Sequence, residues 1–224
     1  MTVKLSAIAP RDVLRASINL GNQALAREEK GELRGLAPAL ARRLADEIKK
    51  PIEFVTYESA GKSFKGASEG MWDVGFLAID TERAKTVSFT RPYKEIVATY
   101  ATWDNSPLQD ADDVDRPGLK IVVARGSAYD LYLKKHLRHA ELIVSDSPAH
   151  SMALFRSGLG DVVGGVMENL QRAFPEGCGI RILSGQIATV RQAMVLPYHD
   201  ADRIAALDDF LAKVVSDKFI SDNI

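Results

Sequence analysis

The chain has 224 residues, of which 46% are hydrophobic and 26% charged, with a formal net charge of −1 and a pI of about 6.4. This length suffices for one large domain or two lobes of ordinary size, and the composition suits a packed core. The balanced charge argues against a nucleic-acid-binding surface, which needs clustered basic residues, and no apolar stretch approaches membrane-spanning length. The single cysteine, Cys178, excludes an intramolecular disulfide, and we interpret it as a structural thiol.

The first half of the chain alternates between strand and helix patterns. Residues 14–20 alternate apolar and polar side chains, as a strand does, and residues 27–35 form a polar loop. Leucines and an isoleucine then recur every fourth residue over 36–48, with Pro38 in the first turn of the expected helix and Pro51 ending it. Further on, we expect strands at 52–57, 73–79 and 96–102, a short helix at 63–70 and a helical turn at 82–85.

The same alternation starts again after an acidic segment at 110–115. We expect strands at 119–124, 140–144, 161–166 and 194–196, and helices at 148–157 and 168–174. A further helix begins at Gly126-Ser127 and continues through Leu137, and an amphipathic helix covers 200–215.

Strands separated by helices predict parallel sheets in an α/β fold. Because the strand–helix–strand–helix–strand pattern occurs twice, we expect two Rossmann-like α/β lobes with a ligand cleft between them. The break between the lobes falls near residues 97–118, and the last helix could pack on either lobe.

One segment, WDVGFLAIDTERAKTVSFTRPY at 72–93, carries the clearest functional pattern. A buried strand ends at a helix start, and a cation, Arg83, lies one turn in. Strand ends and helix N-termini leave backbone groups free, so this arrangement suits a small anionic ligand.

The order and wording of these segments resemble the periplasmic solute-binding proteins of family 3, the polar-amino-acid type, which have the type II periplasmic-binding fold. The resemblance covers about residues 13–218. It implies a first lobe of residues 1–96 with a C-terminal return at 191–224, a second lobe of residues 97–190, and crossovers near residues 93–99 and 189–194. It rests on LRASINLGN, GELRGLAPALARRLADEI, IEFVTYESAGKSFKGASEGMWDV, TERAKTVSFTRPY, LKIVVARGSAYDLYL and ALFRSGLGDVV. The TERAKTVSFTRPY block is the most specific of these.

The resemblance implies a set of ligand-binding residues. Arg83 matches the arginine that pairs with the ligand carboxylate, and its planar fork fits that role, although a surface helix cation is the alternative. Gly126 and Ser127 match the anion-binding turn of the second lobe, with an ordinary helix N-cap as the alternative. Tyr129, near the start of the same helix, could reach the cleft.

The chain also departs from the family pattern. Phe76, Leu77 and Ala78 stand where many members carry small hydroxyl residues, and Asn22 stands near the place of an aromatic residue that stacks on the ligand. Val166 and Met167 replace the aspartate that holds the ligand ammonium, so either Glu168 substitutes for it or the ligand is not an α-amino acid. Asn19 and Asn22 could supply neutral hydrogen bonds, or could simply form the turn.

We therefore expect a solute-binding component of an ABC-type uptake transporter, with no enzymatic activity, cofactor or metal. It would capture a small carboxylate-bearing solute, an amino acid or an organic acid, by hinge closure. Its partners would be that solute and a membrane permease, not nucleic acid, and the chain would be a monomer. The resemblance implies a periplasmic location. No signal peptide is visible in the first residues, so a cytoplasmic location stays open.

Three alternatives remain. An enzyme of the same fold could act as a dehydratase on a cyclic carboxylate, with Glu168 or Asp80 as a general acid or base. A solute-sensing domain without transport would fit the same residues. Gly61-Lys62-Ser63 ends like a phosphate-binding loop, but Thr56 stands where that loop requires its first glycine.

Overall fold

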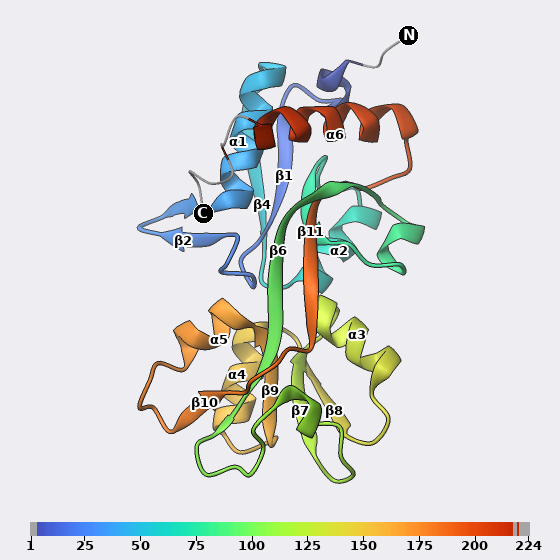
Figure 1. Ribbon diagram of the computed structural model, residues 1–224. Helices are drawn as coiled ribbons and strands as arrows, with labels where there is room; N and C mark the ends of the chain where they lie inside the picture. The colour runs from blue at the N-terminus through green and yellow to red at the C-terminus, as the bar shows by residue number, and fades with distance from the viewer. Residues whose placement is uncertain (1–3, 217–218, 220–224) are drawn as a thin grey trace. The chain divides into compact units, whose positions relative to one another are not determined.

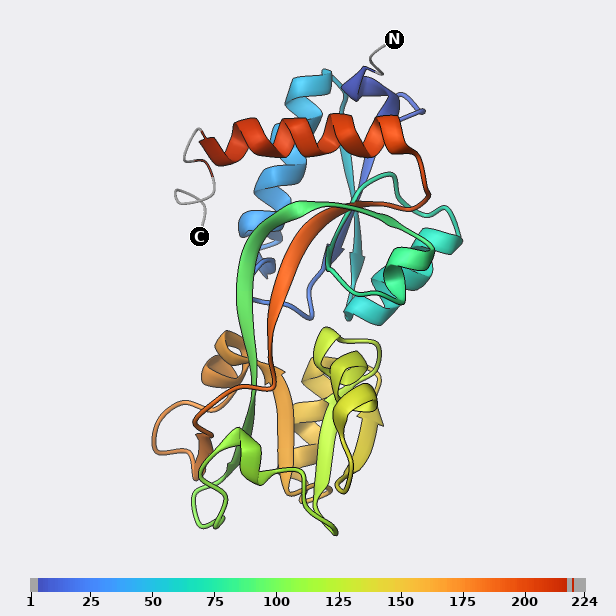
Figure 2. The ribbon, with the colours of Figure 1, turned by 45° about the vertical axis from the view of Figure 1, so that its right-hand side comes forward.

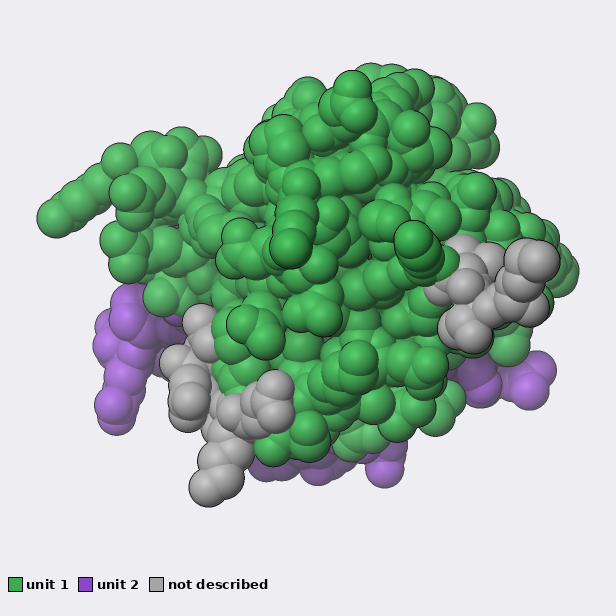
Figure 3. Space-filling model, turned by 90° about the horizontal axis from the view of Figure 1, so that it is seen from above, with its two compact units in different colours: residues 1–95, 191–224 green, residues 96–190 purple. Residues whose placement is uncertain are grey.

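The structure, a computed structural model, describes residues 4–216 and 219. The chain divides into two compact units, which are coloured separately in Figure 3. Unit 1 comprises residues 1–95 and 191–224, and unit 2 comprises residues 96–190. The outer limits of the first expected lobe, residues 1 and 224, lie outside the described residues.

Unit 1 is built on a sheet with a parallel centre. Strands β1 (Leu14–Asn19) and β4 (Ile52–Tyr57) pair in parallel. On the other side of β1, Ser17 donates its backbone N–H to Val74, just before β5 (Gly75–Ala78). Strand β11 (Ala188–Leu196) pairs antiparallel to β5 along residues 192–195. The parallel register brings the ends of β1, β4 and β5 to one edge of the sheet.

Helices cover the sheet of unit 1 (Figure 1). They are α1 (Leu36–Ile48), α2 (Ala60–Ser68), α6 (Ala201–Ser216) and the short turns η1 (Leu5–Ile8) and η2 (Arg83–Lys85). The leucine face expected over 36–48 packs into a core together with the apolar side of α6. Figure 2 shows α6 beside α1 from a second direction. This packing places the C-terminal helix in unit 1.

Unit 2 contains a mixed sheet. Strands β7 (Lys120–Ala124), β8 (Glu141–Ser145) and β9 (Val162–Val166) are parallel to one another. Strand β6 (Ser88–Trp103) enters from unit 1 and pairs antiparallel with β9, and β10 (Ile180–Ile182) pairs antiparallel with β6. Helices α3 (Ala128–His136), α4 (Pro148–Arg156) and α5 (Met167–Ala173) and the turn η3 (Ala111–Asp113) complete the unit.

The α/β class and the order of the main elements are confirmed, whereas the expectation of parallel sheets is wrong in part. Strands β6, β10 and β11 all run antiparallel to their neighbours. The chain passes between the units inside β6 and β11, because the division falls after Glu95 and after Val190. Both strands are much longer than the expected ranges 96–102 and 194–196.

Residues 27–35 are not the polar loop that the sequence predicts. Strands β2 (Arg27–Glu29) and β3 (Glu32–Arg34) form an antiparallel hairpin whose turn holds Lys30 and Gly31, both at positive φ. Glutamate and lysine are depleted in strands, so the charged composition of residues 27–35 predicts a loop and not a hairpin. No helix within the described ranges has both the length and the apolar composition needed to cross a membrane.

Candidate ligand-binding site

Arg83 begins the turn η2, five residues after Ala78 at the end of strand β5, and its side chain is buried in unit 1. Only 2% of its surface is exposed. Its Nη1 donates to the backbone carbonyl of Ala78 at 3.0 Å, and its Cζ lies 6.0 Å from the ring centroid of Phe64 on α2. The guanidinium is therefore held by the end of a buried strand and by an aromatic ring, not by a flexible surface loop.

The turn that carries Arg83 is fixed by Asp80. One carboxylate oxygen of Asp80, Oδ1, accepts the backbone N–H groups of Glu82 at 2.8 Å and of Arg83 at 3.1 Å. Burial lowers the pKa of Arg83 to about 10, and the charge of Asp80 opposes that shift. The guanidinium thus remains protonated at neutral pH, as recognition of a carboxylate requires.

Phe76, Leu77 and Ala78, expected to line the site, are buried in strand β5. Phe76 packs edge-on against Tyr93, with ring centroids 6.3 Å apart, and Leu77 belongs to a second apolar cluster with Trp72. Ala78 contributes its carbonyl to Arg83. In unit 1 these residues therefore form core and support, and Ala78 is the one among them with a direct link to the expected cation.

Asn19 and Asn22 lie at the end of strand β1 and in the turn after it, as expected. The side-chain oxygen of Asn19 accepts the backbone N–H of Gly21 at 3.0 Å, which is the turn-forming alternative. The side-chain oxygen of Asn22 is buried and has no hydrogen-bond partner among the described residues. A buried acceptor without a partner is costly, so Asn22 is the better candidate of the two for a ligand contact.

In unit 2, the expected anion-binding turn already contains a carboxylate. Ser127 caps α3, and its Oγ accepts the backbone N–H of Asp130 at 3.1 Å. Asp130 is fully buried, and its Oδ2 accepts the N–H of Gly126 at 2.8 Å and an ion pair from Lys134 at 2.8 Å. The N–H of Gly126 therefore points to an internal acid, which favours the capping alternative for this residue.

Tyr129 is also buried, close to the same turn. Burial raises the pKa of Tyr129 to about 12; a hydrogen bond with the Ser127 side chain opposes that rise, and the charge of Asp130 adds to it. Ser127, Tyr129 and Asp130 thus belong to one polar network at the start of α3. In this network the Ser127 hydroxyl and the Tyr129 phenol are the groups that could donate to a ligand.

Glu168 lies in the first turn of α5, immediately after strand β9, and its side chain is exposed. Val166 is buried in β9 and Met167 is half-buried, so neither provides the acid that amino-acid binders place here. Glu168 is an accessible carboxylate at the strand end, as the sequence suggests.

Two residues of these environments were not expected from the sequence. Phe64 lies near the Arg83 guanidinium, and Asp130 fills the turn of α3. Phe64 gives no signal in the sequence, because its distance from Arg83 depends on how α2 packs on the sheet. Asp130 could have been found from the Ser127-x-x-Asp130 spacing, which is typical of a helix cap.

The phosphate-loop-like segment finds little support as a site. Ser63 of the phosphate-loop-like segment is buried, and its hydroxyl lies 2.7 Å from that of Ser17. Over residues 4–216 and 219, no group of three or more His, Cys, Asp or Glu side chains is arranged to hold a metal ion. Cys178 is exposed and free.

Comparison with solved structures shows the fold. The L-cysteine solute receptor of Neisseria gonorrhoeae has a TM-score of 0.86 at 19% identity, covering 99% of this chain and 92% of that one. The cysteine-binding protein of Campylobacter jejuni has a TM-score of 0.84 at 18% identity, covering 98% and 90%. An ancestral amino acid-binding protein, a precursor of cyclohexadienyl dehydratase, has a TM-score of 0.78 at 20% identity, covering 97% and 96%.

These matches identify the type II periplasmic-binding fold. No curated protein sequence matches the chain. The profile of the bacterial extracellular solute-binding proteins, family 3, matches residues 22–222. The chain therefore belongs to family 3 of the bacterial extracellular solute-binding proteins.

Proposed function

We propose that this protein is the solute-binding component of an ABC-type uptake transporter and that its solute is small, polar and carboxylate-bearing. The family, and the amino acids bound by solved relatives such as the L-cysteine receptor, support binding over catalysis. The proposal that the solute bears a carboxylate rests on Arg83, a buried, protonated guanidinium placed after a strand end.

Arg83 is suited to recognise a carboxylate because its own surroundings orient it. The Ala78 carbonyl and the Asp80-bound turn hold the side chain before the ligand arrives. A cation that is already positioned loses little conformational entropy on binding. Its planar fork can then donate two parallel hydrogen bonds to one carboxylate.

Asn22 supports the same proposal from the end of β1. Its buried oxygen can accept a hydrogen bond from the solute, which would satisfy an otherwise unpaired group. From unit 2 we assign the hydroxyl groups of Ser127 and Tyr129 to the solute. Gly126 shapes the turn, since its N–H is bonded to Asp130.

The end of the solute opposite the carboxylate decides between an amino acid and an organic acid. Glu168 is exposed at the start of α5 and could accept an ammonium group. A solute without an ammonium would leave Glu168 in water at no cost. Both classes therefore belong to the proposal, and Glu168 distinguishes them.

The proposed role in transport rests on membership of the family, and no contact within the described part of this chain bears on it. We propose that the two units close around the solute by bending within β6 and β11, and that a membrane permease recognises the closed monomer. The periplasmic location is the one typical of the family.

The test is a thermal-shift screen against amino acids and simple carboxylates, followed by calorimetry with the best ligand. A ligand at a hundredfold excess over its Kd stabilises the folded state by about 2.7 kcal/mol. We expect Arg83→Gln to weaken binding of that ligand by tenfold or more, because a charge-assisted hydrogen bond contributes about 1.5–3 kcal/mol.

The matched control is Lys85→Gln, which removes an exposed cation from the same turn. Circular dichroism of both variants separates lost binding from lost folding. Equal affinities for the wild type and a folded Arg83→Gln variant would exclude Arg83 from the site. Glu168→Gln should weaken ammonium-bearing ligands alone; an equal loss for plain carboxylates would make Glu168 structural.

A dehydratase of the same fold is the second candidate. The structural match to a precursor of cyclohexadienyl dehydratase supports this second candidate. Incubation with prephenate-like cyclic acids discriminates, because an enzyme consumes a ligand that a binding protein merely retains. A sensing domain would bind without turnover and without a permease partner.

A further inference from the structure

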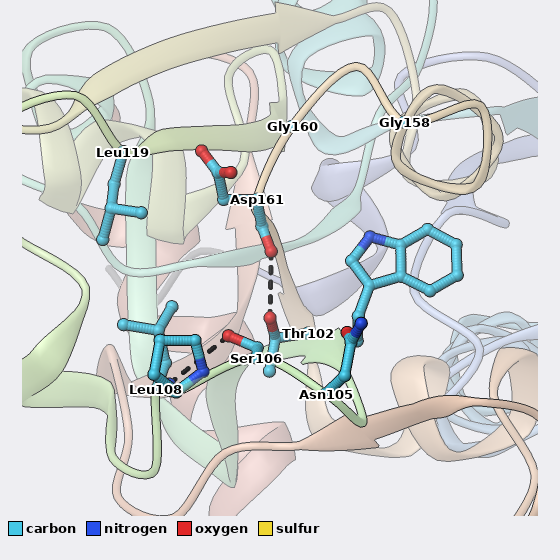
Figure 4. A pocket seen from close by; sticks show the side chains of 10 residues that line it. Thr102, Asn105, Ser106, Leu108, Leu119, Gly158, Gly160 and Asp161 are labelled. Atoms are coloured by element: carbon cyan, nitrogen blue, oxygen red, sulfur yellow. Dashed lines mark hydrogen bonds between the residues drawn. The ribbon is translucent and has the colours of Figure 1, made fainter.

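A pocket lies in unit 2, away from the turn of α3 and from Glu168. It has a volume of about 400 Å³ and lies between the end of β6, the loop that follows it and the segments that precede β7 and β9 (Figure 4). Small-molecule pockets start at about 300 Å³, so it can take a small group.

The pocket is at the opposite edge of the sheet from the candidate site. Leu119 and Asp161 line it, and they precede the parallel strands β7 and β9. Gly126 and Glu168 follow the same two strands. At about 3.3 Å per residue, five-residue strands separate the two edges by about 16 Å. The pocket is therefore a separate site.

Hydrogen bonds fix its walls. Arg181 donates from Nη2 to the carbonyl of Ser106 at 3.0 Å and also to that of Leu108. The hydroxyl of Thr102 donates to the carbonyl of Asp161 at 2.9 Å, the bond drawn across the pocket wall in Figure 4. The loop and the strand ends are thus held in place without a ligand.

The lining favours a cation with an apolar stem. Of the described residues that line the pocket, Asp161 is the one with a charge, and its side chain is exposed. Its Oδ2 accepts the N–H of Lys120 at 2.8 Å, and no bond to its Oδ1 occurs within the described part of the chain. Leu108, Leu119 and Pro107 supply apolar surface.

Trp103 adds an aromatic ring to this lining. It packs on Phe155, with ring centroids 5.1 Å apart and an interplanar angle of 32°, so its position is fixed from the core side. Aromatic rings attract alkylammonium and guanidinium groups, and a carboxylate strengthens that preference.

We propose that this pocket binds an alkyl cation, either a free organic amine or a lysine or arginine side chain of a partner protein. The carboxylate of Asp161 holds the charge, and the apolar side chains of the lining, Leu119 among them, cover the stem. This site is independent of the proposed solute site.

Titration of the whole protein with n-butylammonium, followed by Trp103 fluorescence, tests the free amine. N-acetyl-lysine methylamide tests the side chain. The other tryptophan, Trp72, is 1% exposed and gives a constant background. We expect saturable quenching by at least one cation, and none by the uncharged n-butanol or the norleucine analogue. Equal binding of the uncharged probes, or no binding of either cation, would overturn the proposal.

Asp161→Asn removes the charge and keeps an acceptor for the Lys120 N–H. It should lower the affinity for the cation at least tenfold. The matched control Asp104→Asn alters an exposed acid beside the pocket, and its affinity should stay within twofold of the wild type. Leu119→Lys, at a half-exposed position, places a competing ammonium in the pocket and should abolish binding even if Asp161→Asn fails to fold. Unchanged affinity in folded Asp161→Asn or in Leu119→Lys would overturn the assignment.

Discussion

At some positions of this chain the backbone conformation, and not the side-chain chemistry, requires a particular residue. Gly35, before α1, has φ 108° and ψ 177°, a region that is open to glycine alone. A Cβ there would lie 2.5 Å from the carbonyl oxygen of Leu25, which accepts the backbone N–H of Ala37 at 3.0 Å. The helix has no side-chain cap, so this close approach satisfies one of its first N–H groups.

Gly35→Ala should therefore destabilise unit 1 by about 3 kcal/mol or more, through both strain and collision. Gly31→Ala is the matched control, because Gly31 has φ +80 and nothing within 4 Å of an added Cβ. It should cost about 1–2 kcal/mol, the strain of a left-handed residue alone. Urea unfolding of both variants gives the comparison; equal losses would mean that the Leu25 contact relaxes freely.

Asp130 shows how a residue changes the meaning of a motif. The Gly126-Ser127 pattern suggests an anion-binding turn, but a carboxylate from the same helix occupies the Gly126 N–H. The local sequence allowed either an anion-binding turn or a helix cap. The side-chain geometry favours the cap, because the Gly126 N–H is already bonded within the chain.

Elements are tied together by a few polar contacts between distant segments. Arg91 in β6 donates its backbone N–H to Asp208 Oδ1 at 2.6 Å, and its Nη2 pairs with Oδ2 at 2.7 Å. Asp208 lies on α6, so this contact fastens the C-terminal helix to the strand. The hydrogen bond from Arg91 lowers the pKa of Asp208, and burial opposes it in part.

A lowered pKa in the folded state means that this contact stabilises folding above the ordinary pKa of Asp208. The stabilisation is lost as the pH falls through the lowered, folded-state pKa. Asp208→Asn should reduce the Tm at neutral pH, and the difference from the wild type should shrink on acidification below about pH 4. Thermal melts between neutral and acidic pH measure it, with the exposed neighbour variant Asp209→Asn as control. A difference independent of pH would show that the charge of Asp208 contributes nothing.

Element prediction succeeded where packing agrees with local pattern and failed where it does not. The strand at 52–57 and the helix at 36–48 agree with the structure residue for residue, because their apolar period matches the face they bury. Strand β6 begins eight residues before the expected range: Arg91, Pro92 and Lys94 interrupt the apolar pattern, and pairing with other strands overrides that local signal.

The whole molecule consists of two units connected through β6 and β11. The chain crosses from one unit to the other at residues 95–96 and 190–191. If the protein closes on its solute as we propose, small-angle scattering should show a smaller radius of gyration with saturating ligand. Arg83→Gln at the same ligand concentration should show no change. Ligand binding without any decrease in the wild type would contradict hinge closure.

The sequence alone determined the α/β class, the repeated strand–helix pattern and the family, and it predicts Arg83 as the cation that binds the solute. These depend on periodicity and on local motifs, which are readable within short windows. The tertiary structure decided the antiparallel course of β6, β10 and β11, the burial of Arg83 beside Ala78 and Phe64, the acid within the α3 turn, and the pocket at Asp161. The strand pairing, the Phe64 contact and the pocket join residues from separate elements, and their distances are set by packing that no local pattern encodes. The acid in the α3 turn is a local contact, but the side-chain geometry was needed to choose between a cap and an anion site.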